Sequence, residues 1–310
     1  MAAPVITLPQ VDSEVLAARG WKTVEVPQPD GGSRYVMTPL TAVEFLHPQE
    51  DYHMPISHFH NTANTVLWDL LTRRYAHDPT AEVFHDLLVD WDVPGLGSHS
   101  PDIMVIFGVR NKGINRTRFN VGVEGVRPRL VIEVVSPEYR KEDRVEKLRE
   151  YELAGVPEYI ILDQRRQRGH LVDEALGYEL RGGRYSPILP DEQGRVLSKA
   201  VGLWISLQQG VVVLEDAATG ERLLTSQELA DRIEAAEARA HEAEVQAREE
   251  QAAREAAEAQ ARKEQVARET AEAKAREEQM AREQIEQRLQ ALEAQLRALS
   301  DPRPPTDSSP

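Results

Sequence analysis

Two near-continuous apolar runs dominate the hydrophobic pattern of the chain, at residues 103–109 and 130–135. Runs without polar alternation are typical of strands that are buried on both faces. We therefore expect the centre of a mixed sheet with helices packed against it. The connection between the runs, residues 110–129, is polar and basic.

Helical periodicity precedes the first run, and residues 60–75 predict an amphipathic helix. Its apolar stripe consists of Val66, Leu67, Leu70 and Leu71. Residues 86–92 predict one more strand. Residues 1–39 are rich in Pro, Gly and Asp, so we interpret them as a peripheral lead-in to a domain that covers residues 40–225. The lead-in contains only short strand-like pieces, at residues 23–26 and 34–37.

A helix and further strands are expected after the second run. Ser136 offers a capping hydroxyl and Pro137 suits the first helical position. The helix should extend at least over residues 142–153 and end before Gly155. The rest of the domain predicts strands separated by turns, at residues 158–163, 169–172, 178–180, 184–188 and 203–214.

The last part of the chain has a different composition. Residues 226–300 contain no aromatic residue, no Gly and no Pro, and residues 247–288 repeat every 14 positions, which is two heptads. Abundant Ala and Glu-before-Arg pairs predict one long helix. These pairs are Glu250–Arg254, Glu258–Arg262, Glu264–Arg268, Glu272–Arg276 and Glu278–Arg282. Residues 301–310 predict a disordered tail.

A coiled-coil seam is visible only near the end of this helix. Apolar side chains alternate spacings of four and three there, but the same register places Arg and Glu at core positions further upstream. Two interpretations stay open: a solvated single helix braced by ion pairs, and a homodimer joined through this helix. The apolar positions are Ile285, Leu289, Leu292, Leu296 and Leu299.

Composition excludes several classes of protein. The 310 residues include no cysteine, which excludes a disulfide scaffold, a zinc-thiolate site and a thiol nucleophile. The net charge is −15, and residues 1–225 carry 24 basic against 32 acidic residues, which argues against indiscriminate binding to a polyanion. We find neither a leader pattern nor a run long enough to span a membrane, so we expect a soluble, cytoplasmic protein.

Two carboxylates occupy unusual positions in this pattern. Glu133 lies inside an apolar strand, where an ionised carboxylate is costly unless a cation or hydrogen bonds compensate for the lost water. Asp102 stands at the entrance of the neighbouring strand. Two such carboxylates repel unless they share a cation, and their oxygens suit Mg²⁺ or Mn²⁺. An ion pair between Glu133 and Arg144 and a turn role for Asp102 are the alternatives.

The helix that follows Glu133 adds a cation. Asp143, Lys147 and Tyr151 are spaced four residues apart and share one helix face. A lysine near two carboxylates and a metal can orient an attacking water and offset charge on a phosphate, which predicts phosphodiester hydrolysis. The alternative is an ion pair of Lys147 with Asp143 on a solvated face. The face towards the sheet should consist of Val145, Leu148 and Ala154.

Together these elements resemble the Uma2 family of restriction endonuclease-like proteins, in the PD-(D/E)XK nuclease superfamily. The resemblance covers roughly residues 40–221. It implies an α/β fold, with a restriction-endonuclease-like mixed sheet flanked by helices, and it implies that Asp102 and Glu133 bind the metal. The motifs that carry it are Ser100-Pro101-Asp102, PRLVIEVVSP at residues 128–137, Asp143 with Lys147 and Tyr151, and GVPEY at residues 155–159.

The position of the lysine departs from the superfamily pattern. The superfamily's lysine belongs two residues after the glutamate, where this chain has Val135. The resemblance then implies a lysine on the following helix, with Lys147 as the first choice and Lys141 as the second. Many of these nucleases also supply an acidic residue from an N-terminal helix, for which Glu44 is a weak candidate.

Other polar residues have simpler interpretations. His53, His58 and His60 are close in sequence, but no carboxylate pattern supports a metal site, so we expect surface or helix-start histidines. Ser136 is expected to cap a helix rather than to act as a nucleophile, because no histidine near it in sequence can serve as its base.

We therefore predict a Mg²⁺- or Mn²⁺-dependent endonuclease that acts on nucleic acid, with DNA as the first choice of substrate and RNA as the second. Residues 110–168 carry 14 basic and 10 acidic residues, and they predict a local surface that can contact phosphates. The alternative function is a catalytically silent nuclease-fold scaffold that assembles through its C-terminal coiled coil. Val135 and the long helix are the features that favour it.

Overall fold

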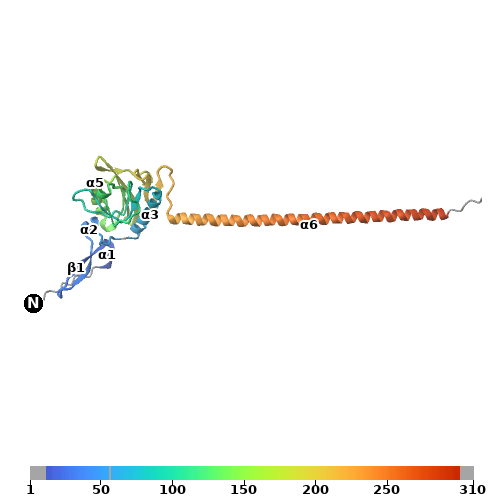
Figure 1. Cartoon of the computed structure of the whole chain (residues 1–310), viewed down its shortest axis with the longest axis horizontal. Coiled ribbons are helices and arrows are strands. Elements are labelled where there is room, and N and C mark those ends of the chain that lie inside the picture. The colour runs from blue at the N-terminus through green and yellow to red at the C-terminus, as the bar shows by residue number, and fades with distance from the viewer. Residues whose placement is uncertain (1–11, 56, 301–310) are drawn as a thin grey trace, which may run out of the picture. The chain divides into compact units, whose positions relative to one another are not determined.

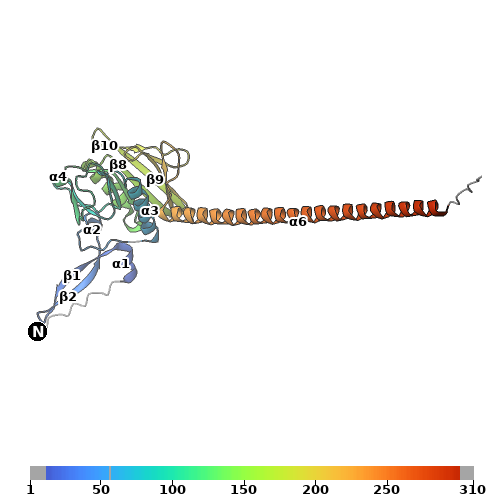
Figure 2. The ribbon, with the colours of Figure 1, turned by 45° about the vertical axis from the view of Figure 1, so that its right-hand side comes forward.

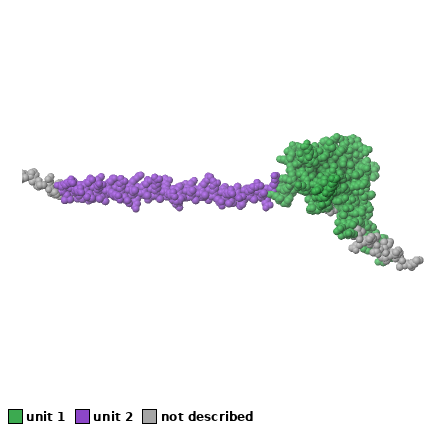
Figure 3. All heavy atoms as spheres, turned by 180° about the vertical axis from the view of Figure 1, so that it is seen from behind, with its two compact units in different colours: residues 1–231 green, residues 232–310 purple. Residues whose placement is uncertain are grey.

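The computed structural model describes residues 12–55 and 57–300 of the chain. The chain divides into two compact units, Met1–Asp231 and Arg232–Pro310, which Figure 3 colours separately. The long helix α6 (Ser226–Ser300) begins in the first unit and makes up the described part of the second. The predicted disordered tail, residues 301–310, lies outside the described residues.

A six-stranded mixed sheet forms the centre of the first unit (Figures 1 and 2). Its strand order is β10-β9-β8-β7-β5-β3; β7 and β8 are parallel, and the other neighbouring pairs are antiparallel. The predicted mixed sheet is confirmed, and the two apolar runs contribute adjacent strands. The strands are β3 (Glu82–Phe84), β5 (Ile103–Ile106), β7 (Pro128–Val134), β8 (Glu158–Gln167), β9 (His170–Arg181) and β10 (Arg184–Ile188).

Burial on both faces explains why β5 and β7 are apolar throughout. All residues of β5 are buried, and successive residues of β7 alternate between two core clusters. Ile132 packs in the cluster that contains side chains of α3 (His58–Arg74), whereas Val131 packs in the cluster that contains Tyr151 of α5 (Lys147–Leu153). Side chains alternate along a strand, so Glu133 shares the face of Val131 and points towards α5.

The amphipathic helix predicted over residues 60–75 is confirmed as α3, which begins two residues earlier. The side chain of Ser57 caps it by accepting the backbone N–H of His60 at 3.1 Å. Leu67, Leu70 and Leu71 are fully buried, so the predicted stripe faces the core.

The helix predicted after Ser136 is irregular in its first half. A 3-10 helix η1 (Pro137–Tyr139) and a π-helical turn η2 (Glu142–Glu146) precede α5. The Ser136 side chain makes no capping hydrogen bond, so its predicted role as a cap is wrong. The prediction that Val145 faces the sheet is also wrong: its side chain is 37% exposed, because the π-helical turn changes the side-chain spacing ahead of α5.

The lead-in is more regular than predicted. It contains helix α1 (Ser13–Arg19) and a hairpin of β1 (Trp21–Pro27) with β2 (Ser33–Pro39). The hydroxyl of Tyr139 lies 3.0 Å from the Arg19 carbonyl and 2.7 Å from the Leu40 carbonyl, which ties this segment to η1. The remaining elements of the first unit are α2 (Ala42–Leu46), β4 (Leu88–Asp90), β6 (Arg118–Asn120), α4 (Val121–Glu124), β11 (Val196–Ser198), β12 (Leu203–Gln208) and β13 (Val211–Asp216).

Helix α6 is continuous, as its composition predicted. The pairs Glu250–Arg254 and Glu258–Arg262 form, at 2.6 and 3.8 Å, whereas Arg268 pairs with the following Glu272 at 3.0 Å. All three pairs are exposed, so each contributes only about 0.3–0.5 kcal/mol. No helix among the described residues is long and apolar enough to cross a membrane.

Candidate active site

Asp102 and Glu133 come together at one end of a strand pair. In the antiparallel register of β5 and β7, Ile103 lies opposite Ile132, so the next residues outward, Asp102 and Glu133, are cross-strand neighbours. Their side chains are buried, with residue exposures of 7% and 1%. The fold thus places two carboxylates side by side in a region that water barely reaches.

Helix α5 brings a cation and a hydroxyl to this carboxylate pair. Lys147 Nζ lies 2.8 Å from Oε2 of Glu133 and 2.9 Å from Oδ1 of Asp143. The hydroxyl of Tyr151 donates to Oε1 of Glu133 at 2.6 Å. Asp143, Lys147 and Tyr151 therefore lie on one helix face, as their spacing predicted. Lys147 is only 4% exposed, which excludes the alternative of a solvated ion pair.

The alternative partners considered for this cluster lie elsewhere. Arg144 binds Asp163 at 2.6 Å and Glu174 at 2.8 Å rather than Glu133. Lys141 pairs with Glu146 at 3.1 Å, and its side chain is 72% exposed. Glu44 belongs to the capping box of α2 and pairs with Lys22. The structure therefore brings neither Lys141 nor Glu44 into the cluster.

His60 belongs to the cluster, which sequence reasoning missed. Its Nε2 lies 3.0 Å from Oδ1 of Asp102, and the backbone N–H of Val134 donates to Oδ2 of Asp102 at 2.6 Å. His60 is a helix-start histidine, as expected, but its ring is turned towards Asp102, which the expectation did not include. His58 and His53 are exposed, as expected, and His53 stacks on Trp21 with ring centroids 3.7 Å apart.

Burial and neighbouring charges shift the pKa values of Glu133 and Asp102 in opposite directions. Burial, together with the charges of Asp102 and Asp143, outweighs the attraction of Lys147 and raises the pKa of Glu133 to about 8. Burial also opposes ionisation of Asp102, but the charge and hydrogen bond of His60 outweigh it and lower the pKa of Asp102 to about 2. Burial alone would lower the pKa of Lys147, but the negative charges of the surrounding carboxylates outweigh this effect and raise it.

Comparison with known proteins identifies the family of the chain. The family model Uma2, described as "Putative restriction endonuclease", matches residues 37–208, which is more than half of the chain. The chain belongs to the Uma2 family. Asp102, Glu133 and Lys147 all lie inside the matched region, called the Uma2 region below.

Solved structures are similar to part of the chain, among them a crystal structure at 1.96 Å of "a putative nuclease belonging to DUF820" from Anabaena variabilis ATCC 29413. The identity is 15%, the similarity covers 53% of this chain and 91% of that chain, and the TM-score is 0.36. The search of curated proteins found no match.

Side chains of the cluster in the Uma2 region line a pocket of about 780 Å³, although Glu133 itself is not one of the lining residues. Asp102, Asp143 and Lys147 line it, together with Asp86, which sequence reasoning missed. The backbone N–H of Asp86 donates to the carbonyl of Pro101 at 3.1 Å, next to Asp102. Asp86 has a φ of +50°, a conformation that aspartate tolerates better than most residues and that no local pattern of the sequence signals.

The donor set of this pocket fits a hard divalent cation. Three buried carboxylates, Asp102, Glu133 and Asp143, lie close to Lys147 and His60, and the more exposed Asp86 pairs with His85 at the pocket wall. Buried carboxylates in excess of their cations repel one another, and a divalent ion would relieve that repulsion. Their oxygen donors are of the type that binds Mg²⁺ or Mn²⁺.

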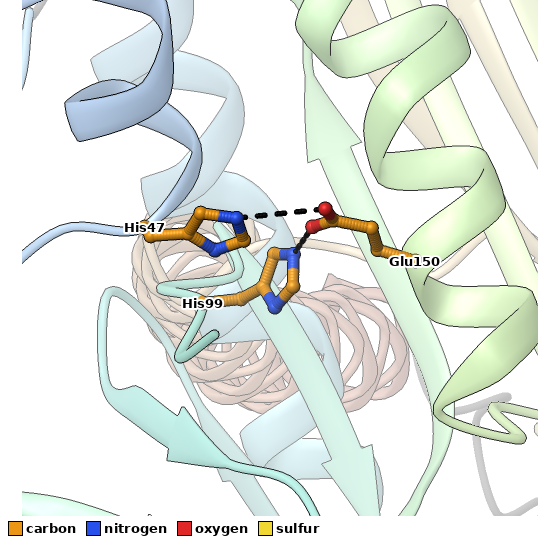
Figure 4. Close-up of side chains that lie close together, drawn as sticks. All are labelled: His47, His99 and Glu150. Atoms are coloured by element: carbon orange, nitrogen blue, oxygen red, sulfur yellow. Dashed lines mark hydrogen bonds and ion pairs between the residues drawn. The ribbon is translucent and has the colours of Figure 1, made fainter. Parts of the chain in front are cut away.

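A second group of candidate ligands lies beside α5 and consists of His47, His99 and Glu150 (Figure 4). Their ligand atoms lie within 4.8 Å of one another. His99 Nε2 is 2.6 Å from Glu150 Oε2, and the indole N–H of Trp91 donates to His99 Nδ1 at 2.8 Å.

The bond from Trp91 determines what this group can do. Because Nδ1 of His99 accepts a hydrogen bond, the proton of the neutral ring must lie on Nε2, where Glu150 accepts it. A cation at Nε2 would have to displace that proton and leave an imidazolate. The geometry therefore fits a chain of hydrogen bonds from Trp91 through His99 to Glu150 better than it fits a metal site.

The basic surface predicted over residues 110–168 is largely neutralised by local partners. Arg116, for example, is buried between Glu82 and Glu124, at 3.2 and 3.0 Å. Arg166 and Arg168, at the turn between β8 and β9, are exposed. Further arginines of this stretch that pair with carboxylates are Arg118, Arg127, Arg140, Arg144 and Arg165.

Proposed function

We propose that this protein is a metal-dependent endonuclease that hydrolyses phosphodiester bonds, with DNA as its substrate. The observation that carries the proposal is the buried contact of Lys147 with Glu133, opposite Asp102 across the β5–β7 pair. Membership in the Uma2 family supports the nuclease class. The metal, Mg²⁺ or Mn²⁺, and the DNA substrate are further parts of the proposal.

Each residue of the cluster has a role that follows from its contacts. Asp102 and Glu133 would hold the cation, which when bound would polarise a phosphoryl oxygen and acidify a water. His60 and the Val134 N–H orient the carboxylate of Asp102, and Tyr151 orients that of Glu133. Lys147 carries a positive charge at the pocket wall, where it offsets charge that develops on the phosphate and can orient the attacking water.

The proposal is tested by Glu133→Gln, which removes the charge but keeps the volume of the buried side chain. Plasmid DNA, single-stranded DNA and RNA are incubated with Mg²⁺ or Mn²⁺, and calorimetry follows Mn²⁺ binding. We expect metal-dependent cleavage of DNA by the wild type, its loss in Glu133→Gln, and full activity in the matched control Glu138→Gln, because Glu138 is exposed.

The same measurements separate the proposal from the scaffold alternative. Equal cleavage by wild type and Glu133→Gln would refute the assigned site. A wild type that neither cleaves nor binds Mn²⁺, or that binds Mn²⁺ equally well after Asp102→Asn, would favour a catalytically silent protein that assembles through α6.

A further inference from the structure

The pocket extends beyond the carboxylates to uncharged and aromatic side chains that the catalytic cluster does not use. Asn64, Trp68 and His85 line this part. A volume of about 780 Å³ is within the usual range for a site that encloses a small organic ligand, and it exceeds what a hydrated cation needs.

Trp68 is exposed where helix packing does not require a large apolar residue. The neighbouring residues Leu67, Leu70 and Leu71 already fill the core-facing stripe of α3 and are fully buried. Trp68 is 42% exposed, and its ring meets His85 edge-on, with centroids 5.4 Å apart and an interplanar angle of 64°. Part of the indole surface therefore stays available to a flat ligand.

Asn64 lies one helical turn before Trp68, so the two side chains share a face of α3. Asn64 is 7% exposed, and its Oδ1 is buried with no hydrogen-bond partner among the described residues. A buried, unsatisfied amide is rare and costly in a folded protein. Such a group in a pocket wall is typical of a site whose polar partner arrives with the ligand.

Charge indicates which part of a ligand this region can accept. The lining includes Glu50, Asp86, Asp102 and Asp143 against Lys147 and His60, so the net negative charge disfavours a phosphate away from a bound cation. An aromatic face and an amide bind a nucleobase, which stacks on the ring and pairs its edge with the amide.

We propose that the Trp68 end of the pocket binds one unstacked nucleobase, which stacks on the Trp68 indole while the Asn64 amide hydrogen-bonds its edge. The inference rests on the proposed function, because it places the base beside the carboxylates that would hold the metal. It makes single-stranded DNA the preferred substrate, because a nucleotide of a duplex must first be unstacked and turned out. Intact duplex is bound more weakly, since its stacked bases cannot reach the indole.

The test measures binding separately from cleavage. A single-stranded oligonucleotide of about eight nucleotides and a blunt duplex of the same sequence are titrated with Ca²⁺ in place of Mg²⁺, and gels confirm that both stay intact. We expect tighter binding of the single strand and quenching of tryptophan fluorescence. Trp68→Ala should weaken single-strand binding at least tenfold, which is about 1.4 kcal/mol, whereas Trp68→Phe should largely preserve it.

Two further variants test the role of Asn64 and provide a control for the tryptophan substitution. Asn64→Leu should also weaken binding and alter the preference among A, C, G and T oligonucleotides. Trp204→Phe is the matched control, because Trp204 does not line the pocket and its ring lies instead under Arg195, 4.9 Å away. It should leave both affinity and quenching by the oligonucleotide unchanged.

The outcomes distinguish this inference from the proposed function. Metal-dependent cleavage with unchanged single-strand binding by Trp68→Ala would overturn the base site alone. Binding that depends on Trp68 and Asn64, in a protein that cleaves nothing, would support the base site and overturn the nuclease activity. Equal or stronger binding of the duplex by the wild type would also overturn the base site.

Discussion

Lys147 Nζ lies 2.8 Å from Glu133 Oε2, although the two residues are 14 positions apart in the sequence. In the superfamily pattern a lysine two residues after the glutamate would stand at Val135, on the same face of β7. Here Val135 is buried in the core cluster on that face, and α5 supplies the ammonium group instead. The Lys147 side chain also packs over the Phe45 ring, with Nζ 4.9 Å from the ring centroid.

Replacement of Lys147 by methionine should destabilise the first unit strongly. The change leaves the buried Asp143 carboxylate without its cation and removes the ammonium donor to Glu133, and loss of one partner of a buried pair costs about 3–5 kcal/mol. Urea unfolding followed by tryptophan fluorescence measures this, because every tryptophan lies in the first unit.

Lys141→Met is the matched control for that experiment. Lys141 is exposed, so its replacement should change the free energy of unfolding by less than about 0.5 kcal/mol. Similar unfolding midpoints for the two variants would contradict a buried, charged role for Lys147.

Binding of Mn²⁺ should release protons at neutral pH. A carboxylate must be ionised to bind a metal, and Glu133, with a pKa raised to about 8, holds its proton at pH 7, whereas Asp102, with a pKa lowered to about 2, has none to lose. Affinity should therefore rise with pH up to about 8 and then level off. Calorimetry in two buffers of different ionisation enthalpy measures the released protons.

Glu133→Gln provides the control for proton release. Residual Mn²⁺ binding in this variant should show an enthalpy that is much less dependent on the buffer. If the wild-type enthalpy does not change between buffers at pH 7, Glu133 either does not bind the metal or is already ionised.

The sheet and the carboxylate pair could be predicted because their signals are local. An uninterrupted apolar run identifies β5 and β7, and a glutamate inside such a run is conspicuous whatever the rest of the fold. The i,i+4 spacing placed Lys147 and Tyr151 on one face even though the helix before them is π-helical, because the irregular turn ends where Lys147 begins.

The residues that escaped prediction depend on contacts between distant elements. His60 reaches Asp102 from 42 positions away, through the packing of α3 on the sheet, and a histidine at a helix start looks the same with or without that contact. Asp86 enters the pocket through a left-handed backbone conformation, which its own sequence neighbours do not specify. The neutralised arginines, such as Arg116 between Glu82 and Glu124, likewise depend on tertiary pairing that net charge cannot reveal.

His99 should make the first unit less stable in mild acid. Burial lowers the pKa of this ring below its ordinary value of 6.5 and outweighs the bond to Glu150. Below about pH 6.5 the imidazole of His99 is protonated in the unfolded chain but stays neutral in the folded protein. The contribution of His99 to the free energy of unfolding is therefore fully present above this pH and is lost as pH decreases. The raised pKa values of Glu133 and His60 act in the opposite direction over the same range, so the contribution of His99 is measured by comparing urea midpoints at pH 7.5 and pH 5.5 between the wild type and a His99 variant.

Two histidine variants identify the source of that loss. Between pH 7.5 and pH 5.5 the change in stability of His99→Leu should be more favourable than that of the wild type, but the variant should cost about 1–3 kcal/mol at pH 7.5, because the Trp91 indole N–H loses its acceptor. His47→Leu, which removes a partly exposed ring of the same group, is the control and should alter the pH dependence less than His99→Leu does. An unchanged pH dependence in His99→Leu would contradict this contribution of His99.

Helix α6 should join two copies of the protein through its last heptads. Ile285, Leu289 and Leu292 are each more than half exposed on a helix whose upstream part is covered by charged residues, and their spacing of four and three is that of a coiled-coil core. We expect the full-length protein to sediment as a dimer at micromolar concentration and the double variant Leu289→Lys/Leu292→Lys to sediment as a monomer. Val266→Lys, outside the seam, should remain dimeric, whereas a monomeric wild type at high micromolar concentration would leave α6 as a solvated single helix.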